Sequence, residues 1–218
     1  LHRQKQTSRL DNPDSARYAV ANWQYAITLP DSARRARRFW RALERVDEVF
    51  GPRSKQRALA LSAYAPLTDD STLALYDETL SLLQENVAPS NANLLHTRFS
   101  FGVELVESGH VERGFRQLRV ALRQFKQNGA TGWYGYGRIM YAALLKDEGR
   151  SQQARSILQR VQAWQEQNLP PIHKDRSYLW MVFADIAFDQ KRYPTAAKRY
   201  RRALQIGTQL HGPRAKPN

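Results

Sequence analysis

Histidines and neighbouring carboxylates are the side chains of this 218-residue chain best suited to acid–base or metal chemistry, but their spacing assembles no site. No two of the histidines His96, His110, His173 and His211 lie four residues apart, as two metal ligands on one helix would. There is no HExxH motif, no GxSxG motif and no cysteine. We therefore predict that the chain is not an enzyme and uses neither a metal nor a cofactor.

A glycine-rich stretch, Trp133-Tyr134-Gly135-Tyr136-Gly137, raises the question of phosphate binding. It lacks the GxGxxG and Walker spacings that place backbone N–H groups around a phosphate. Aromatic residues stand beside the glycines instead. We interpret the glycines as small residues that allow these aromatic side chains to pack where a helix begins.

Positive charge dominates the composition. The chain has 34 Lys and Arg against 20 Asp and Glu, a net charge of +14 and a pI near 10.3. One interpretation is an acidic partner such as nucleic acid. The other is a solvated, arginine-rich helix face, because runs of charge are weakly specific. The residues that we single out for an anionic contact are Arg116, Arg119 and Arg123.

The elements that must position these side chains are helices in a repeated arrangement. In the stretch GVELVESGHVERGFRQLRVAL, residues 102–122, the apolar spacing predicts one helix ending near Gly109 and another beginning near Val111. Gly114, in the second helix, would allow the two backbones to pack closely. The same small-residue position recurs at spacings of 42, 40 and 42 residues, where it is occupied by Thr72, Gly114, Ala154 and Ala196. A fixed period of this size is typical of a repeat array.

On these residues the chain resembles a tetratricopeptide repeat (TPR) protein with units of about 40 residues. The residues that carry the resemblance are Trp180, Phe183, Ala184, Tyr193, Ala196, Tyr200 and Ala203 in one unit, and Gly102, Gly109, Gly114, Leu118 and Ala121 in another. Arg98 and Arg138 stand where that family often has Trp. The resemblance implies an all-α fold, a right-handed α-solenoid of about five antiparallel helix pairs.

Proline, glycine and capping residues divide the chain. We expect a flexible lead-in at residues 1–14, a helical repeat domain at 15–212 and a tail at 213–218. Asp31 or Ser32 should cap one helix, and Pro66 should give the second pair a turn of different geometry. The helix pairs are expected at 15–28 with 32–50, 54–65 with 70–84, and then on either side of Gly109, Gly149 and Lys191.

The last helix keeps apolar residues at Leu204, Ile206 and Leu210, and nothing after Gly212 could cover them with a further helix. Solenoid ends usually carry a polar cap. We expect either more chain in a parent protein or a homo-oligomer that forms through this helix, the alternative being a modestly apolar edge. The chain begins with Leu rather than Met, which suggests a processed or excised fragment.

In the resembling family, one face of each first helix lines a concave groove that receives a peptide. The repeat register projects onto an aromatic lining with acidic spots, which suits partner binding. The predicted groove residues are Arg57, Tyr64, His96, Phe99, Val106, Tyr136, Ile139, Lys146, Tyr178, Met181, Asp185, Phe188 and Asp189. The alternative for several of them, such as Phe99 and Ile139, is a place in the core. Asp185 and Asp189 favour a neutral or basic ligand segment.

These observations lead to the hypothesis of a protein–protein interaction or ligand-sensing scaffold, a module of a larger bacterial signalling or regulatory protein. The step to signalling is an analogy with the resembling family. The alternative is a nucleic-acid-binding helical repeat that uses the arginine-rich convex face, with Trp40 as a stacking group. No apolar run approaches the length of a membrane span, so we expect no membrane insertion. We expect a cytoplasmic location, with the periplasm as the alternative.

Overall fold

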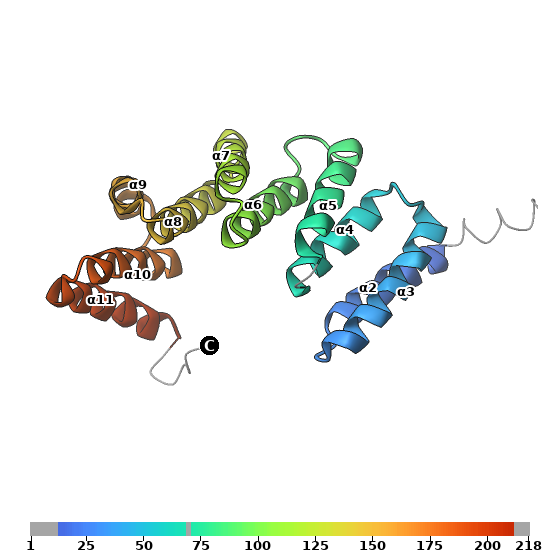
Figure 1. Cartoon of the computed structure of the whole chain (residues 1–218), viewed down its shortest axis with the longest axis horizontal. Coiled ribbons are helices and arrows are strands. Elements are labelled where there is room, and N and C mark those ends of the chain that lie inside the picture. Colours follow the sequence, from blue (N-terminus) through green and yellow to red (C-terminus); the bar gives the residue numbers. More distant parts are fainter. Residues whose placement is uncertain (1–12, 69–70, 212–218) are drawn as a thin grey trace, which may run out of the picture. The chain divides into compact units, whose positions relative to one another are not determined.

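The computed structural model describes residues 13–68 and 71–211, and all regular structure in these ranges is helical. The predicted all-α class is therefore confirmed. The α-helices, labelled as in Figure 1, are α2 (Pro13–Ile27), α3 (Ser32–Phe50), α4 (Lys55–Tyr64), α5 (Thr72–Asn86), α6 (Ala92–Glu107), α7 (Val111–Gln127), α8 (Thr131–Asp147), α9 (Ser151–Asn168), α10 (Lys174–Asp189) and α11 (Tyr193–His211). A 3-10 turn, η1 (Ala65–Leu67), follows α4.

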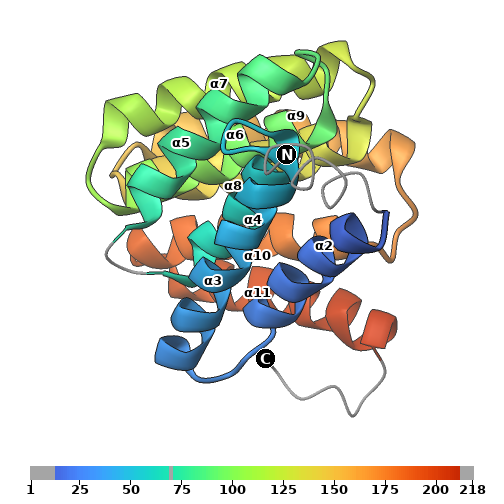
Figure 2. The ribbon, with the colours of Figure 1, turned by 90° about the vertical axis from the view of Figure 1, so that its right-hand side faces the viewer.

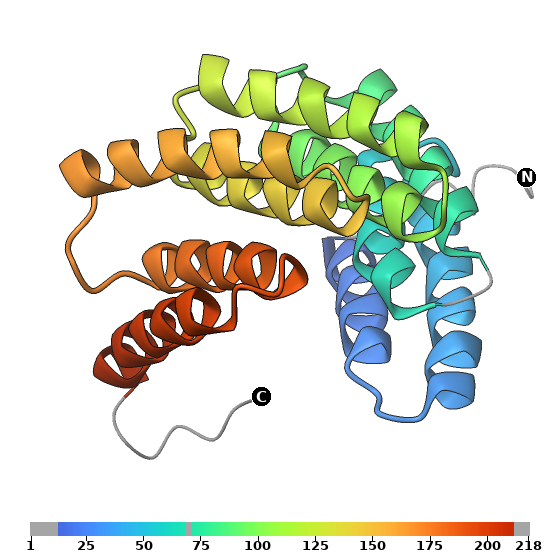
Figure 3. The same ribbon diagram turned by 60° about the vertical axis from the view of Figure 1, so that its left-hand side comes forward.

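The helices form two compact units, the first ending at Gln117 and the second beginning at Leu118, so that the boundary falls within α7. In the first unit, α2 packs against α3, and α5 packs against both α4 and α6 (Figures 1 and 2). In the second unit, α8 packs against α9 and α10 against α11, and α10 also contacts α8 and α9 (Figure 3). Sequential helices therefore associate as pairs, in agreement with the predicted solenoid class.

The predicted boundaries differ from the structure in small ways. The repeat domain expected at 15–212 stays a prediction, and α2 begins at Pro13, two residues earlier than expected. A proline at the start of a helix costs nothing, because its missing N–H would have no partner inside the helix. Of the expected lead-in, residues 1–12 lie outside the described part of the chain, as do the tail at 213–218 and Gly212.

Two predicted helix starts are formed by side-chain caps. The backbone N–H of Arg34 donates to a carboxylate oxygen of Asp31 at 2.6 Å, so Asp31, rather than Ser32, is the N-cap of α3. Ser54 caps α4 in the same way, accepting from the N–H of Arg57 at 3.2 Å. Each cap satisfies an N–H group that the first turn of a helix leaves without a partner.

Three turns between paired helices share one geometry. Gly109, Gly149 and Lys191 follow α6, α8 and α10, and all three have positive φ, at 84°, 73° and 59°. In the first turn, the N–H of His110 donates to the carbonyl oxygen of Leu105 at 2.7 Å, and the other two turns repeat this bond. This pattern closes a helix through a left-handed residue, usually glycine. The repeated turn explains the regular spacing of the units. In these three turns, Lys191 is the residue with positive φ that is not a glycine.

The small-residue position of α7, Gly114, lies against the backbone of α6. A Cβ atom placed on Gly114 would lie 2.6 Å from Cγ2 of Val106, closer than real Cβ contacts allow. The corresponding residues of α5, α9 and α11, Thr72, Ala154 and Ala196, are all buried. The close backbone approach predicted at Gly114 is confirmed. Thr72 is the largest of the four residues, and it follows the predicted irregular turn, in which Pro66 lies within η1.

Aromatic and aliphatic side chains form the core of each unit. In the first unit, the rings of Phe39 and Tyr64 stack with centroids 4.0 Å apart, and Phe101 is fully buried. In the second unit, Ile139 and Leu158 are fully buried. In the glycine-rich stretch, Gly135 faces Trp164 of α9, because a Cβ on Gly135 would lie 3.1 Å from the ring of Trp164. Within the described residues, no helix has the length and apolar character that a membrane span requires.

Candidate functional site

Four of the predicted groove residues are buried, which corrects their assignment to an accessible surface. Tyr64, Phe99 and Val106 of the first unit expose 4%, 6% and 4% of their surface, and Ile139 of the second exposes none. Tyr64 lies in the aromatic stack with Phe39, and Val106 is covered by the close approach at Gly114. These side chains pack in the interior of their units rather than on an accessible surface. The core interpretation considered for Phe99 and Ile139 therefore applies to both.

Arg57 has a structural role that the sequence did not indicate. Its guanidinium pairs with Asp47 of α3, and its Nε donates to a carboxylate oxygen of Glu78 of α5 at 2.8 Å. The side chain is only 16% exposed. Burial raises the pKa of Asp47, although the charge and hydrogen bond of Arg57 oppose that shift. Arg57 thus connects three helices, and its donors are directed inward at these two carboxylates.

His96 is the remaining predicted groove residue of the first unit. It is half-buried in α6, and burial lowers its pKa, which favours the neutral imidazole. A neutral, half-covered histidine gives a partner little charge to recognise. The first unit therefore retains few of the accessible groups that the projected groove required.

The second unit keeps most of its predicted groove residues accessible. Along α10, residues 179, 182, 183, 186 and 187 are buried, which turns the opposite side of the helix outward. Met181 and Phe188 are 44% and 55% exposed, and Asp189 is also exposed. We call the outward set, with its neighbours on α8, the α10 face; it comprises Tyr136, Lys146, Tyr178, Met181, Asp185, Phe188 and Asp189.

Ring stacking joins the two helices at one end of the α10 face. Tyr136 of α8 and Tyr178 of α10 stack with their centroids 5.8 Å apart and an interplanar angle of 29°. The hydroxyl oxygen of Tyr178 lies 2.7 Å from Sδ of Met140. Trp133 extends the cluster edge-on to Tyr136, with centroids 6.1 Å apart. This end of the face is a fixed aromatic surface, which costs little conformational entropy when a partner binds.

Carboxylates surround a lysine at the other end. The ammonium of Lys146 lies 2.5 Å from a carboxylate oxygen of Asp147. Burial lowers the pKa of Lys146, but the hydrogen bond to Asp147 and the charges of Asp147, Asp185 and Asp189 together raise it above the usual value. Three carboxylates around one ammonium leave a local excess of negative charge. This end of the α10 face is therefore acidic in a chain whose net charge is +14.

Tyr200 of α11 is a residue of this site that the sequence reasoning missed. Its hydroxyl donates to a carboxylate oxygen of Asp185 and raises the pKa of Tyr200 to about 12, with burial and the charges of Asp185 and Asp189 acting in the same direction. The position of the turn could have indicated this contact, because residues equally distant from the centre of a helical hairpin lie side by side. Asp185 and Tyr200 stand seven and eight residues from the turn at 192.

The arginines predicted to contact an anion, Arg116, Arg119 and Arg123, are exposed along α7, the first in one unit and the other two in the next. In the second unit, part of this surface is hollowed. A cavity of about 420 Å³ is lined by Arg119, Leu122, Arg123, Lys126, Tyr134, Arg138, Tyr141, Ile157 and Arg160. Burial and the charge of Arg160 lower the pKa of Arg138, with the Tyr134 side chain opposing them. The cavity is strongly basic.

Other predicted features have no further support as sites. Among the described residues, no three histidine or carboxylate side chains come together as metal ligands do. The outer side of α11 exposes Leu204 and Leu210, while Ile206 is buried. Self-association through α11 stays a prediction.

Comparison with known proteins identifies the fold. No family model and no curated protein matches the sequence. The structure is similar to a crystal structure from Podosopora anserina that contains the nearly identical TPR-like repeats of a putative kinesin light chain. The TM-score is 0.74 and the sequence identity 11%, and the match covers 94% of this chain and 100% of that one. It is also similar to BtubC (BKLC) from P. vanneervenii, with a TM-score of 0.69, 14% identity and coverage of 99% and 93%.

These similarities define the class of protein. The chain has the TPR-like repeat fold, an all-α solenoid, and the resemblance seen in its sequence is confirmed. At such low identity the similarity shows the fold alone, so the function must be argued from this chain's own side chains.

Proposed function

We propose that the chain is a protein-interaction module and that the α10 face binds a segment of a partner protein. The observation that carries this proposal is the alternation, on one side of α10, of exposed apolar side chains with carboxylates. Met181 and Phe188 are the apolar members, and Asp185 and Asp189 are the acidic ones. Exposed Met and aromatic side chains are enriched at sites of protein recognition.

The charges favour a basic segment. Arginine or lysine side chains of the partner would reach Asp185 and Asp189, while its apolar residues would cover Met181 and Phe188. The Tyr136–Tyr178 stack would bound the segment at the other end. We also propose, as the finer part of the sequence hypothesis, that this module belongs to a larger bacterial signalling or regulatory protein in the cytoplasm.

A peptide-display selection against the whole chain, followed by fluorescence anisotropy with the selected peptides, tests the proposal. We expect selected peptides to combine Lys or Arg with apolar residues. The variant Asp185→Asn/Asp189→Asn should weaken their binding about tenfold, because it removes two charge pairs worth up to about 1 kcal/mol each. The amide oxygen at position 185 can still accept the hydrogen bond from Tyr200, so the packing of α10 on α11 is preserved.

The matched control is Glu148→Gln/Glu166→Gln, which removes the same charge from exposed positions outside the α10 face. It should change affinity less than twofold. Equal weakening by both variants would show that general attraction, rather than this face, binds the peptides. Selection of acidic peptides would contradict the proposed polarity.

A further inference from the structure

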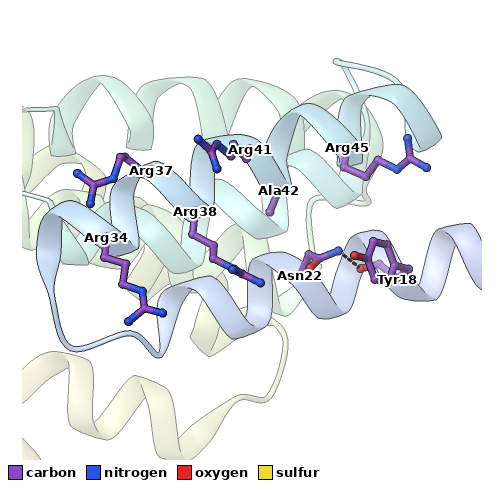
Figure 4. Close-up of a pocket in the computed structure, with 8 residues that line it drawn as sticks. All are labelled: Tyr18, Asn22, Arg34, Arg37, Arg38, Arg41, Ala42 and Arg45. Atoms are coloured by element: carbon purple, nitrogen blue, oxygen red, sulfur yellow. Dashed lines mark hydrogen bonds between the residues drawn. The ribbon is translucent and has the colours of Figure 1, made fainter.

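A groove between α2 and α3 collects five arginines in the first unit. It has a volume of about 400 Å³ and is lined by Tyr18, Asn22, Arg34, Arg37, Arg38, Arg41, Ala42 and Arg45. Figure 4 shows the arginines along α3, with Arg34 and Arg38 extending toward α2, and Tyr18 and Asn22 along α2. No acidic residue is among the described residues that line it.

The arginines follow the length of α3. Arg34, Arg38, Arg41 and Arg45 are spaced by four, three and four residues, which places them on one side of the helix. At a rise of 1.5 Å per residue, the row spans roughly 16 Å, with steps of about 5 to 6 Å. The groove is therefore a line of guanidinium groups, suited to a linear anion with repeated negative charges.

This row is unfavourable for the helix itself. Like charges three or four residues apart repel and destabilise a helix by a few tenths of a kcal/mol per pair. Within the part of the chain that the structure describes, Arg45 of this row forms an ion pair with Glu48 at 2.5 Å. Arg34 uses its backbone N–H, not its guanidinium, to bond Asp31. A bound anion would remove the repulsion, so the row is better explained by a ligand than by the stability of α3.

The opposite wall supplies one aromatic ring, that of Tyr18, whereas Tyr25 of the same helix is not among the residues that line the groove. Tyr18 and Tyr25 of α2 are seven residues apart and are 64% and 50% exposed. The guanidinium of Arg38 lies over the ring of Tyr25, 5.2 Å from its centroid, and the Asn22 side chain donates to the Tyr18 carbonyl oxygen at 3.0 Å. The side chains of a carboxylate-rich peptide do not stack on exposed rings, whereas nucleic-acid bases do.

From this arrangement we propose that the α2–α3 groove binds single-stranded nucleic acid. The α3 arginines contact successive phosphates, for which the planar guanidinium fork is well suited, and a base stacks on the exposed ring of Tyr18. A duplex keeps its bases stacked on one another, so none of them is available to stack on Tyr18. The site is distinct from the α10 face, and neither proposal depends on the other.

Fluorescence anisotropy of the whole chain with labelled oligo(dT) and oligo(U) of about 12 nucleotides, within the site sizes of single-strand binders, tests this proposal. A duplex and a polyglutamate peptide of matched length are the competing probes. With about four phosphates neutralised, the logarithm of the association constant should fall with the logarithm of salt at a slope of about −3, since each contact contributes about −0.7.

Two variants with the same charge change locate the binding. Arg34→Gln/Arg38→Gln/Arg41→Gln should weaken oligonucleotide binding at least tenfold and reduce the magnitude of the slope by about 2, by the same contribution per phosphate. The control is Arg116→Gln/Arg119→Gln/Arg123→Gln on α7, which should reduce affinity less than threefold. Glutamine is a good helix former, so the first variant should unfold at the same temperature as the wild type or higher.

A second pair of variants isolates stacking. Tyr18→Ala should weaken binding about tenfold with an unchanged salt slope, because each stacked base contributes without neutralising a phosphate, and Tyr18→Phe should retain binding. The proposal is overturned if polyglutamate or the duplex binds as tightly as the single strands, if both arginine variants lose affinity equally, or if no oligonucleotide binds.

Discussion

The carbonyl oxygen of Gly102 in α6 lies so close to Gly114 in α7 that a Cβ atom at position 114 would be only 2.7 Å from it. The same Cβ would lie 2.6 Å from Cγ2 of Val106. Gly114→Ala should therefore force the two helices apart. Overpacking costs about 1–3 kcal/mol and the better helix propensity of alanine returns up to about 1 kcal/mol. We expect a net loss of about 1–2 kcal/mol in the free energy of unfolding by urea.

Gly207→Ala provides the matched control. Gly207 is also within a helix, but the nearest atom to its added Cβ would be Oγ of Ser177 at 3.8 Å, an ordinary contact. This variant should gain about 0.5–1 kcal/mol from helix propensity alone. A stabilising Gly114→Ala would contradict the close approach of α6 and α7.

Lys191 is the residue at which one repeated turn departs from glycine. Its φ of 59° is unfavourable for a residue with a Cβ atom, whereas Gly149 has the same role at 73°. We expect Lys191→Gly to raise the free energy of unfolding by about 0.5–1 kcal/mol, and Gly149→Lys to lower it by a similar amount. Thermal unfolding of the two reciprocal variants measures both effects. A loss of stability in Lys191→Gly would mean that the lysine side chain makes a contact worth more than the strain.

Local features of the fold could be predicted from the sequence because each depends on a few adjacent residues. Asp31 accepts a hydrogen bond from a free N–H at the start of a helix, and Gly109 adopts the left-handed conformation that ends one. The small residue of each second helix was visible as a period, since the same close packing recurs in each pair. Such constraints restrict the residue types and their spacing, so they can be recognised in the sequence.

The division of each first helix between core and surface could not be predicted in the same way. Phe99 is buried and Met181 exposed, although both were placed in the groove by the same repeat register. A helical period gives the direction of a side chain, not what lies against it. The inward role of Arg57 depends on Asp47 and Glu78, which are 10 and 21 residues away, and no local pattern links them.

The ion pairs of Arg57 should contribute strongly to stability. Arg57→Gln leaves the carboxylate of Asp47 partly buried without its cation, and one oxygen of Asp47 already has no hydrogen-bond partner. Removing one partner of a fully buried pair costs 3–5 kcal/mol, so about 2 kcal/mol is expected at this partly exposed site. Arg53→Gln is the control, because the pair of Arg53 with Glu85 is exposed and should contribute less than about 1 kcal/mol.

The same variant has a predictable pH dependence. Burial already raises the pKa of Asp47, and loss of Arg57 should raise it further. A carboxyl group whose pKa is raised by folding holds its proton more tightly in the folded state, so stability falls as pH rises through that pKa. The difference between Arg57→Gln and the wild type should therefore shrink as the pH is lowered toward the ordinary pKa of aspartate. Urea unfolding at several pH values gives this difference, and a constant value would exclude Asp47 as the cause.

The hydrogen bond from Tyr200 to Asp185 should be visible in an alkaline titration. The pKa of Tyr200 is raised to about 12, so this tyrosine should remain protonated while exposed tyrosines ionise. The tyrosinate absorbance of the wild type minus that of Tyr200→Phe isolates its titration. Asp185→Asn should return the pKa toward its ordinary value of 10, because the acceptor loses its negative charge.

The raised pKa also fixes the direction of the effect on stability. Between pH 10 and about 12 the folded chain holds a proton at Tyr200 that the unfolded chain has lost, so this contribution is complete below pH 10 and disappears as the pH rises through 12. Tyr200→Phe lacks the ionisable group and should lose less stability than the wild type over this range. If both proteins lose stability in parallel, the bond to Asp185 does not hold α11 against α10 in solution, and the acidic end of the α10 face must be positioned by the buried side of α10 alone.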